Sequence, residues 1–203
     1  MASVAEGALV PLLSASGIAK EFLVPGWRVG WVVAHELGAA APPVMREVRG
    51  GLFALSQLVL GACALPLAAL PAVLAPAPGS EDARALAQFR RDTCATLARH
   101  AALCVDALRG APGLRCVAPR AAMYLMVAVD CAALGVRDDV DFAQRLLQAE
   151  NVFVLPGQCF AGPGFVRIVF CAPPRMLAEA CARIAAFCAA RAAAVAAGAA
   201  TSS

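Results

Sequence analysis

The sequence predicts a mixed fold in two parts, an α/β part over residues 1–80 and an α+β part over residues 81–203. Three observations predict this division. Residues 1–78 are apolar and concentrate their glycines and prolines in short turns. The segment APAPGSED (75–82) has the composition of a linker. After residue 81, apolar positions follow helical spacing in some segments and strand spacing in others.

The first part contains two runs that are typical of strands, LVPLLSAS (9–16) and WRVGWVVAH (27–35), with a loop at 17–26 between them. Apolar runs of this length, joined by turns, are typical of strands in a buried sheet. Helices are expected to follow the second strand.

The second part begins with a predicted helix over about 81–109. Ser80 is its expected N-cap, because acidic residues follow it in the first turn, and Gly110 with Pro112 ends the helix. The elements expected after it are strands at 114–119, 123–129, 151–156 and 165–170, a helix at 139–150 and a helix from about Pro174 to Ala197.

The composition excludes two broad classes of protein. The 203 residues are 61% hydrophobic and only 15% charged, which excludes disorder for most of the chain. The net charge is +3 and no run of basic residues occurs, which argues against a nucleic-acid binder.

Nine cysteines are scattered without a CxxC pair, and the two histidines, His35 and His100, lie apart. We therefore expect neither a disulfide framework nor a metal site, and we expect most of the cysteines to pack as small hydrophobic residues. This usage is typical of a reducing compartment, so we expect the cytoplasm. Neither histidine is expected to be catalytic.

A membrane-associated protein with one helix at about 52–70 is an alternative from another class. No charge occurs from Gly50 to Ser80, and residues 52–70 are long and apolar enough to cross a bilayer. Arginines lie before this stretch and acidic residues after it, as in a positive-inside topology. The prolines in its second half favour a buried core helix instead, and we do not expect a membrane partner.

Lys20 is the only lysine in a chain that contains 16 arginines. A guanidinium group does not lose its proton in proteins, whereas an amine does. A lysine retained among so many arginines therefore indicates a site where a neutral amine is needed, as in Schiff-base formation. The alternative is an ordinary surface lysine.

Small residues surround Lys20, and Arg28 follows in the sequence between Gly26 and Gly30. Small neighbours leave room for a flat cofactor, and the planar guanidinium suits a phosphate ester. An imine-forming lysine with a phosphate-binding arginine is the combination that pyridoxal phosphate requires. The alternative for Arg28 is a surface arginine on a strand.

The segment SGIAKEFLVPGWRVGW (16–31) resembles the pyridoxal-phosphate attachment segment of class I aminotransferases. From Gly17 to Gly30 it follows that family's order of small, apolar, small and Lys, then Gly-x-Arg-apolar-Gly. Within the family it is most similar to the tyrosine aminotransferases, whose segment also reads AK, LVPGWR and GW. The resemblance implies that Lys20 carries the cofactor and then removes the α-carbon proton, and that Arg28 binds the cofactor phosphate.

Two downstream segments extend the resemblance. PRAAMYLMV (119–127) resembles a small-domain segment of the family, with Ala121 at a position where the family has glycine. If that position needs a positive φ, alanine costs about 1 kcal/mol there. The only tyrosine, Tyr124, is expected to be a core or domain-interface residue, and a substrate-facing role is the alternative.

VLPGQCFAGPGFVRIVF (154–170) resembles the segment that carries the family's substrate-binding arginine. The resemblance implies that Arg167 binds the substrate α-carboxylate as a bidentate pair. The residues agree in kind, because a lone arginine inside an apolar strand needs an anionic partner. The alternative is a structural ion pair.

The resemblance implies the C-terminal portion of a fold-type-I enzyme, with a remnant of the large cofactor domain at 1–80 and the small domain at 81–203. The implied reaction transfers an amino group from an aromatic, tyrosine-like amino acid to a 2-oxo acid. The family works as homodimers, and the apolar residues 50–78 are a candidate part of that interface.

The resemblance covers only the C-terminal half of an aminotransferase. The family's Asp at the pyridine nitrogen, its Asn and Tyr at the ring oxygen and its phosphate-binding turn cannot be placed in this sequence. We therefore expect the 203-residue chain alone to bind the cofactor weakly and to turn over little or not at all. A non-catalytic remnant that dimerises through its apolar face is the other alternative.

Overall fold

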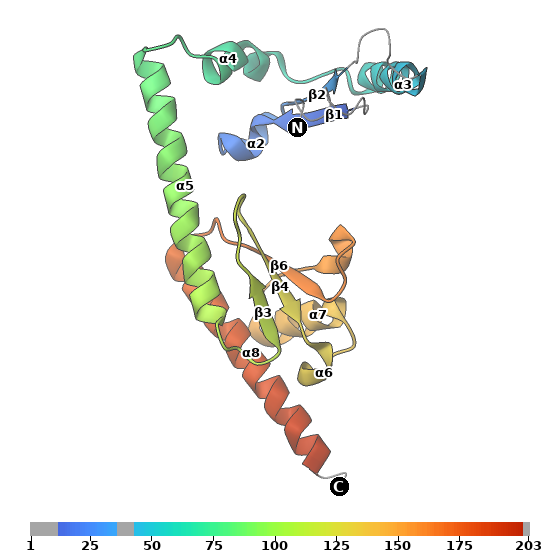
Figure 1. Ribbon diagram of the computed structural model, residues 1–203, viewed down its shortest axis with the longest axis vertical. Helices are drawn as coiled ribbons and strands as arrows, with labels where there is room; N and C mark the ends of the chain where they lie inside the picture. Colours follow the sequence, from blue (N-terminus) through green and yellow to red (C-terminus); the bar gives the residue numbers. More distant parts are fainter. Residues whose placement is uncertain (1–11, 36–42, 201–203) are drawn as a thin grey trace. The chain divides into compact units, whose positions relative to one another are not determined.

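The computed structural model describes residues 12–35 and 43–200, and Figure 1 labels their helices and strands. The chain divides into two compact units, residues 1–84 and 85–203. This division falls within the first turns of helix α5 (Glu81–Leu108), whereas the sequence places the boundary just before that helix.

The described part of the first unit contains a two-stranded antiparallel ribbon and three α-helices. Strands β1 (Leu12–Gly17) and β2 (Gly30–His35) pair from Leu12 opposite His35 to Gly17 opposite Gly30. The connection between them holds α2 (Ile18–Glu21) and the 3-10 turn η1 (Pro25–Trp27), and the helices that follow are α3 (Pro43–Val59) and α4 (Ala64–Leu74). The predicted strand at 9–16 begins outside the described residues. The second strand starts at Gly30 and not at Trp27 as predicted, because Trp27 is the last residue of η1.

Two glycines let the ribbon close tightly at its loop end. A Cβ on Gly17 would lie 3.0 Å from the carbonyl oxygen of Val29, and a Cβ on Gly30 would lie 3.0 Å from that of Ser16. The amide of Ile18 donates to the Val29 oxygen at 3.3 Å. The far end is joined by the Ser14 hydroxyl and Nε2 of His35, 2.8 Å apart.

The prediction of a buried sheet in the first unit is wrong for the described residues. The buried apolar side chains of this unit are those of Ile18, Val29 and Met45, and the strands leave Leu13, Val32 and Val33 exposed. A two-stranded ribbon has too little surface to bury both faces of its own strands, so their apolar composition does not produce a core.

The membrane alternative predicts one helix at 52–70. This prediction is also wrong, because α3 ends at Val59 and α4 begins at Ala64. Within the described residues, one helix segment, Pro174–Gly198, is long and apolar enough to cross a membrane. A core helix passes the same test, and this segment places Leu177, Cys181 and Ile184 in the core of the second unit.

The second unit is a four-stranded antiparallel sheet with helices packed on it, as predicted, but the strand expected at 151–156 is present only at its last two residues. The strand order is β3-β4-β6-β5. The strands are β3 (Leu114–Val117), β4 (Tyr124–Val129), β5 (Leu155–Pro156) and β6 (Phe165–Val169). The remaining elements are α6 (Cys131–Leu134), α7 (Asp139–Glu150), the 3-10 turn η3 (Gly157–Phe160) and α8 (Pro174–Ala200).

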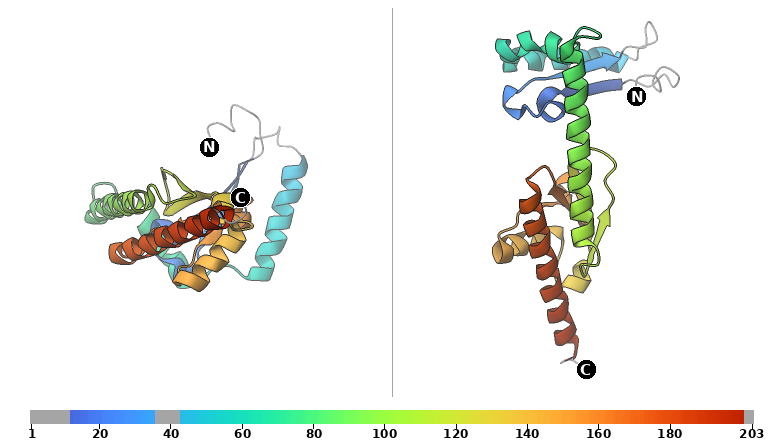
Figure 2. Two further views of the ribbon diagram at one scale, coloured as in Figure 1. Left: turned by 90° about the horizontal axis from the view of Figure 1, so that it is seen from below. Right: turned by 90° about the vertical axis from the view of Figure 1, so that its left-hand side faces the viewer.

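The core of this unit lies between one sheet face and the helices. Alternate residues of β4, among them Leu125 and Val127, are fully buried. Phe142 of α7 packs edge-on against Phe187 of α8, with ring centroids 5.6 Å apart. The second half of α5 and the first half of α8 lie side by side (Figures 1 and 2). Cys104 of α5 and Cys181 of α8 are both buried in the core.

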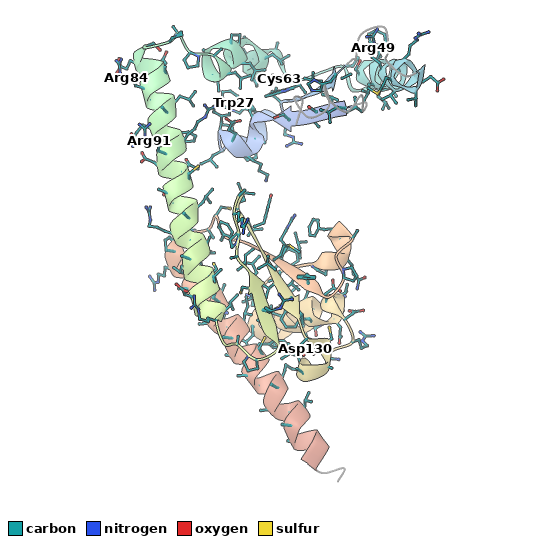
Figure 3. The ribbon with its side chains drawn as sticks, viewed as in Figure 1. Trp27, Arg49, Cys63, Arg84, Arg91 and Asp130 are labelled. Atoms are coloured by element: carbon teal, nitrogen blue, oxygen red, sulfur yellow. The ribbon has the colours of Figure 1, made fainter. Side chains whose placement is uncertain are left out.

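Local capping signals set the helix starts. Ser80 accepts a hydrogen bond from the Ala83 amide at 3.1 Å, which confirms the predicted N-cap of α5. Asp138 caps α7 by accepting from the Asp141 amide at 2.8 Å, and Asp130, labelled in Figure 3, caps α6 by accepting from the Ala133 amide at 3.0 Å. The positive φ considered for Ala121 occurs instead at Ala122, where φ is 62°.

The nine cysteines are free thiols, and their burial is mixed. Cys104, Cys181 and Cys188 are buried in the core, and Cys116 and Cys131 are half-buried. Burial raises the pKa of the Cys188 thiol to about 12. The other four, Cys63, Cys94, Cys159 and Cys171, are exposed, so the expected packing as small hydrophobic residues holds for about half of them.

Candidate active-site residues

Lys20 lies in the single turn of helix α2, immediately after the ribbon closes. Ile18 in the same turn is 1% exposed, whereas Lys20 is exposed. Residues two apart in a helix point to nearly opposite sides, so burying Ile18 turns the lysine side chain outward. Within the described part of the chain, no hydrogen bond or ion pair holds the Lys20 amine.

Arg28 follows η1 in a left-handed backbone conformation, with φ 53° and ψ 39°. This region is unfavourable for a residue with a Cβ, and such residues concentrate at functional sites. The exposed guanidinium donates through Nη1 to the Pro25 carbonyl oxygen at 3.1 Å. The other nitrogens of Arg28 are left available for an anion.

One loop thus carries both predicted cofactor-binding residues. Helices α2 and η1 contact each other between the paired ends of β1 and β2. Trp27, the last residue of η1 and partly exposed, belongs to the same loop and is labelled in Figure 3. The closed end of the ribbon therefore presents an amine and a guanidinium from a short connection.

Arg167 lies on β6 of the second unit, opposite Met126 of β4 and Leu155 of β5. Its guanidinium carbon lies 4.3 Å from the ring centroid of Tyr124 and 3.8 Å from that of Phe160. Cations over aromatic rings at these distances are attracted by the negative ring faces. The two rings therefore hold the guanidinium in place.

The Nε of Arg167 is buried and has no hydrogen-bond partner within the described residues. The ion pairs found there join other residues, so the structural ion pair considered for Arg167 is not present among them. A buried donor without a partner costs about 1–3 kcal/mol, and a carboxylate would satisfy it together with the neighbouring N–H groups. Arg167 also lines a cavity of about 260 Å³ whose other lining residues are mostly apolar.

The partners of Arg167 are the part of the site that sequence reasoning missed. Tyr124, expected in a core or interface, is half-buried and contacts the guanidinium. No role was predicted for Phe160, although it lies in the segment 154–170 that resembles the family's. It is also the single aromatic residue in the loop that joins β5 to β6.

That loop is anchored by Asp139, a carboxylate that is only 1% exposed at the start of α7. It accepts hydrogen bonds from the Gln158 amide at 3.0 Å, from Nε2 of Gln158 at 3.1 Å and from the Gly164 amide at 3.1 Å. Burial opposes its ionisation, but these donors outweigh burial and hold the pKa of Asp139 below its ordinary value.

The histidines have structural contacts. Nδ1 of His100, in α5, lies 2.9 Å from the carbonyl oxygen of Phe170 at the end of β6. Residues 12–35 and 43–200 contain no group of three His, Cys, Asp or Glu side chains that could hold a metal ion. Lys20 and Arg28 belong to the first unit and Arg167 to the second.

Known proteins match this chain over most of its length. The family model for aminotransferase class I and II matches residues 2–184. The tyrosine aminotransferase of Homo sapiens is 41% identical over 180 residues, which are 88% of this chain and 37% of that protein. The tyrosine aminotransferase of Dictyostelium discoideum is also 41% identical, over 88% of this chain and 42% of that protein.

A solved structure, the tyrosine aminotransferase from Leishmania infantum, matches with a TM-score of 0.75 and 30% identity, over 89% of this chain and 42% of that one. The chain thus spans 37–42% of the length of these relatives. The matched range 2–184 contains the Lys20 loop, the Tyr124 strand and the Arg167 strand. The chain therefore belongs to the class I and II aminotransferase family, and its fold is that of part of a fold-type-I aminotransferase.

Proposed function

We propose that this chain provides the catalytic lysine and the substrate-binding arginine of a pyridoxal-phosphate-dependent aminotransferase. The substrates proposed are an aromatic, tyrosine-like amino acid and a 2-oxo acid, as the names of the relatives suggest. The observation that carries the proposal is the loop between β1 and β2, which exposes Lys20 and Arg28 from one tightly closed ribbon end.

The residues of this loop fit pyridoxal phosphate. Lys20 would hold the cofactor covalently through Nζ, and Arg28 would bind its phosphate with the nitrogens that do not contact Pro25. Gly17, Ala19 and Gly26 are small, so they leave space beside the amine. When bound, the cofactor supplies an electron sink for the charge that develops at the substrate α-carbon.

The chain's own residues would bind the substrate and move one proton. Arg167 would bind the α-carboxylate through its unpartnered Nε and a neighbouring N–H, and this fixes the orientation of the amino acid. Lys20, released from the cofactor when the substrate amine takes its place, would then remove the α-carbon proton with its neutral Nζ. We further propose a homodimer that uses the apolar residues 50–78, and a cytoplasmic location.

Reductive labelling tests this proposal cleanly, because Lys20 is the only lysine and competes only with the terminal amine. The 203-residue chain would be incubated with pyridoxal phosphate, reduced with borohydride and mapped as peptides. We expect the label on Lys20, its loss in Lys20→Arg and a weaker yield in Arg28→Ala. Arg109→Ala, which removes an exposed arginine paired only with Asp106, is the matched control and should label normally. A label confined to the terminal amine would contradict the proposal.

A further inference from the structure

The loop that carries Phe160 is held by a backbone hydrogen bond within it and by a buried carboxylate outside it. It runs from Gly157 to Gly164 between β5 and β6, and the amide of Gly162 donates to the Gly157 oxygen at 3.0 Å. A Cβ on Gly157 would lie 2.0 Å from the Gly162 oxygen, so the two backbones approach as closely as glycine allows. Asp139 then ties both ends of the loop to α7.

Asp139 is an unusual anchor for such a loop because it is charged and buried. Burying an ionised carboxylate is unfavourable unless donors surround it. Its donors come from Gln158 and Gly164, one on each side of Phe160 in the sequence. Releasing this carboxylate would therefore free both flanks of the residue whose ring lies 3.8 Å from the Arg167 guanidinium.

We propose that Asp139 is a positioning residue for Arg167, acting through the loop 157–164 to keep the Phe160 ring against the guanidinium that binds the substrate carboxylate. This inference rests on the proposed carboxylate-binding role of Arg167. An arginine side chain has many rotamers, and immobilising it before the ligand arrives removes an entropic penalty from binding. The Tyr124 ring contributes the other aromatic contact, but it is part of β4 and needs no separate anchor.

The test observes the Nε–H group of Arg167 by NMR in the full 203-residue chain. The signal is assigned by its loss in Arg167→Lys. Because Nε is buried and the guanidinium lies over two rings, we expect a slowly exchanging, ring-shifted proton. Titration with 2-oxoglutarate as the carboxylate probe then measures binding at the same group.

Asp139→Asn should move this signal toward that of an exposed arginine and weaken 2-oxoglutarate binding about tenfold, as expected for lost charge-assisted hydrogen bonds. Asp138→Asn is the matched control, because this adjacent carboxylate caps α7, while the hydrogen bonds found between α7 and the loop in the described residues go to Asp139. It should leave both readouts unchanged. Phe160→Leu should reproduce the Asp139→Asn result, and Phe160→Tyr should restore the wild-type signal.

Each outcome decides a separate point. A folded Asp139→Asn chain with an unchanged Arg167 signal and unchanged binding overturns the proposal. If Asp139→Asn does not fold, Gln158→Ala removes only the side-chain donor to Asp139, and an unmoved Arg167 signal in that variant overturns it equally. If wild-type Arg167 does not respond to 2-oxoglutarate, its carboxylate-binding role fails, while the signal in the variants still decides whether Asp139 positions it.

Discussion

The two units of the chain use their apolar side chains in different ways. In the second unit, β4, β6 and the helices α5, α7 and α8 share one core. In the described part of the first unit, Ile18, Val29 and Met45 are the buried apolar residues, while Phe53 is 66% and Leu58 is 79% exposed. Apolar residues therefore form a core only where several elements pack together. The exposed apolar side chains of α3 are typical of an interaction surface.

The two units can be followed separately in one sample. The only tyrosine, Tyr124, belongs to the second unit, and both tryptophans, Trp27 and Trp31, belong to the first.

The largest effect is expected from Phe142→Ala, because this ring is fully buried against Phe187. Removing a buried phenylalanine costs about 3–5 kcal/mol. Urea unfolding followed at Tyr124 should shift to much lower midpoints. Phe53→Ala, the same change at an exposed site of the first unit, should stay within about 0.5 kcal/mol, and equal effects of the two changes would refute the comparison.

Acid should unfold the second unit first. The two buried carboxylates of the described residues, Asp139 and Asp141, belong to that unit. Hydrogen bonds from the backbone and side chain of Arg137 and from Arg145 hold the pKa of Asp141 well below its ordinary value, and the loop donors lower that of Asp139 against its burial.

The sign follows from those directions. The unfolded chain binds protons near an ordinary pKa of about 4, whereas the folded unit binds them only at lower pH. The stabilisation is therefore present above about pH 4 and is lost as the pH falls through the folded-state pKa values. We expect the Tyr124 signal to lose its native character before the tryptophan signals do. The opposite order would contradict this prediction.

Gly17→Ala should disturb the lysine loop of the first unit. The added Cβ would lie 3.0 Å from the Val29 oxygen and 3.3 Å from the Gly30 Cα, and both neighbours are backbone atoms. A forced shift of this kind costs about 1–3 kcal/mol. The yield of borohydride-reduced cofactor on Lys20 should fall. Gly50→Ala in α3, where an added Cβ would meet nothing within 4 Å, is the control and should leave the yield unchanged.

The smallest effect concerns the start of α5. Ser80→Ala removes the hydrogen bond to the Ala83 amide and should destabilise the helix by about 1 kcal/mol, measured by thermal unfolding. Ser56→Ala is the matched control, since the Ser56 hydroxyl bonds only to the Phe53 oxygen within α3. Alanine favours a helix interior, so this control should be neutral or slightly stabilising.

Local patterns predicted the elements of the second unit well. The helix predicted at 139–150 is α7. Ser80 caps α5, the helix predicted over about 81–109. The strand that carries Arg167 lies in its sheet as predicted. These features depend on side chains within one or two turns, so the sequence contains the whole signal.

Predictions failed where the backbone geometry of a turn decides the outcome. Residues 52–70 look like one continuous apolar helix, yet α3 ends at Val59 and α4 begins at Ala64, and Leu60 and Gly61 between them have positive φ. The positive φ at Arg28 and at Ala122 was equally invisible, since each follows from how a turn closes rather than from the residue itself.

The sequence by itself determined which residues we propose for the chemistry: a single lysine, an arginine after it in one short loop, and an arginine in an apolar strand. Only the tertiary structure decided how the last of these is held. Tyr124, Asp139, Phe160 and Arg167 come from different elements, and no local pattern links them. They meet because β4 pairs with β6 in the antiparallel sheet and because the buried Asp139 binds the loop between β5 and β6 to α7.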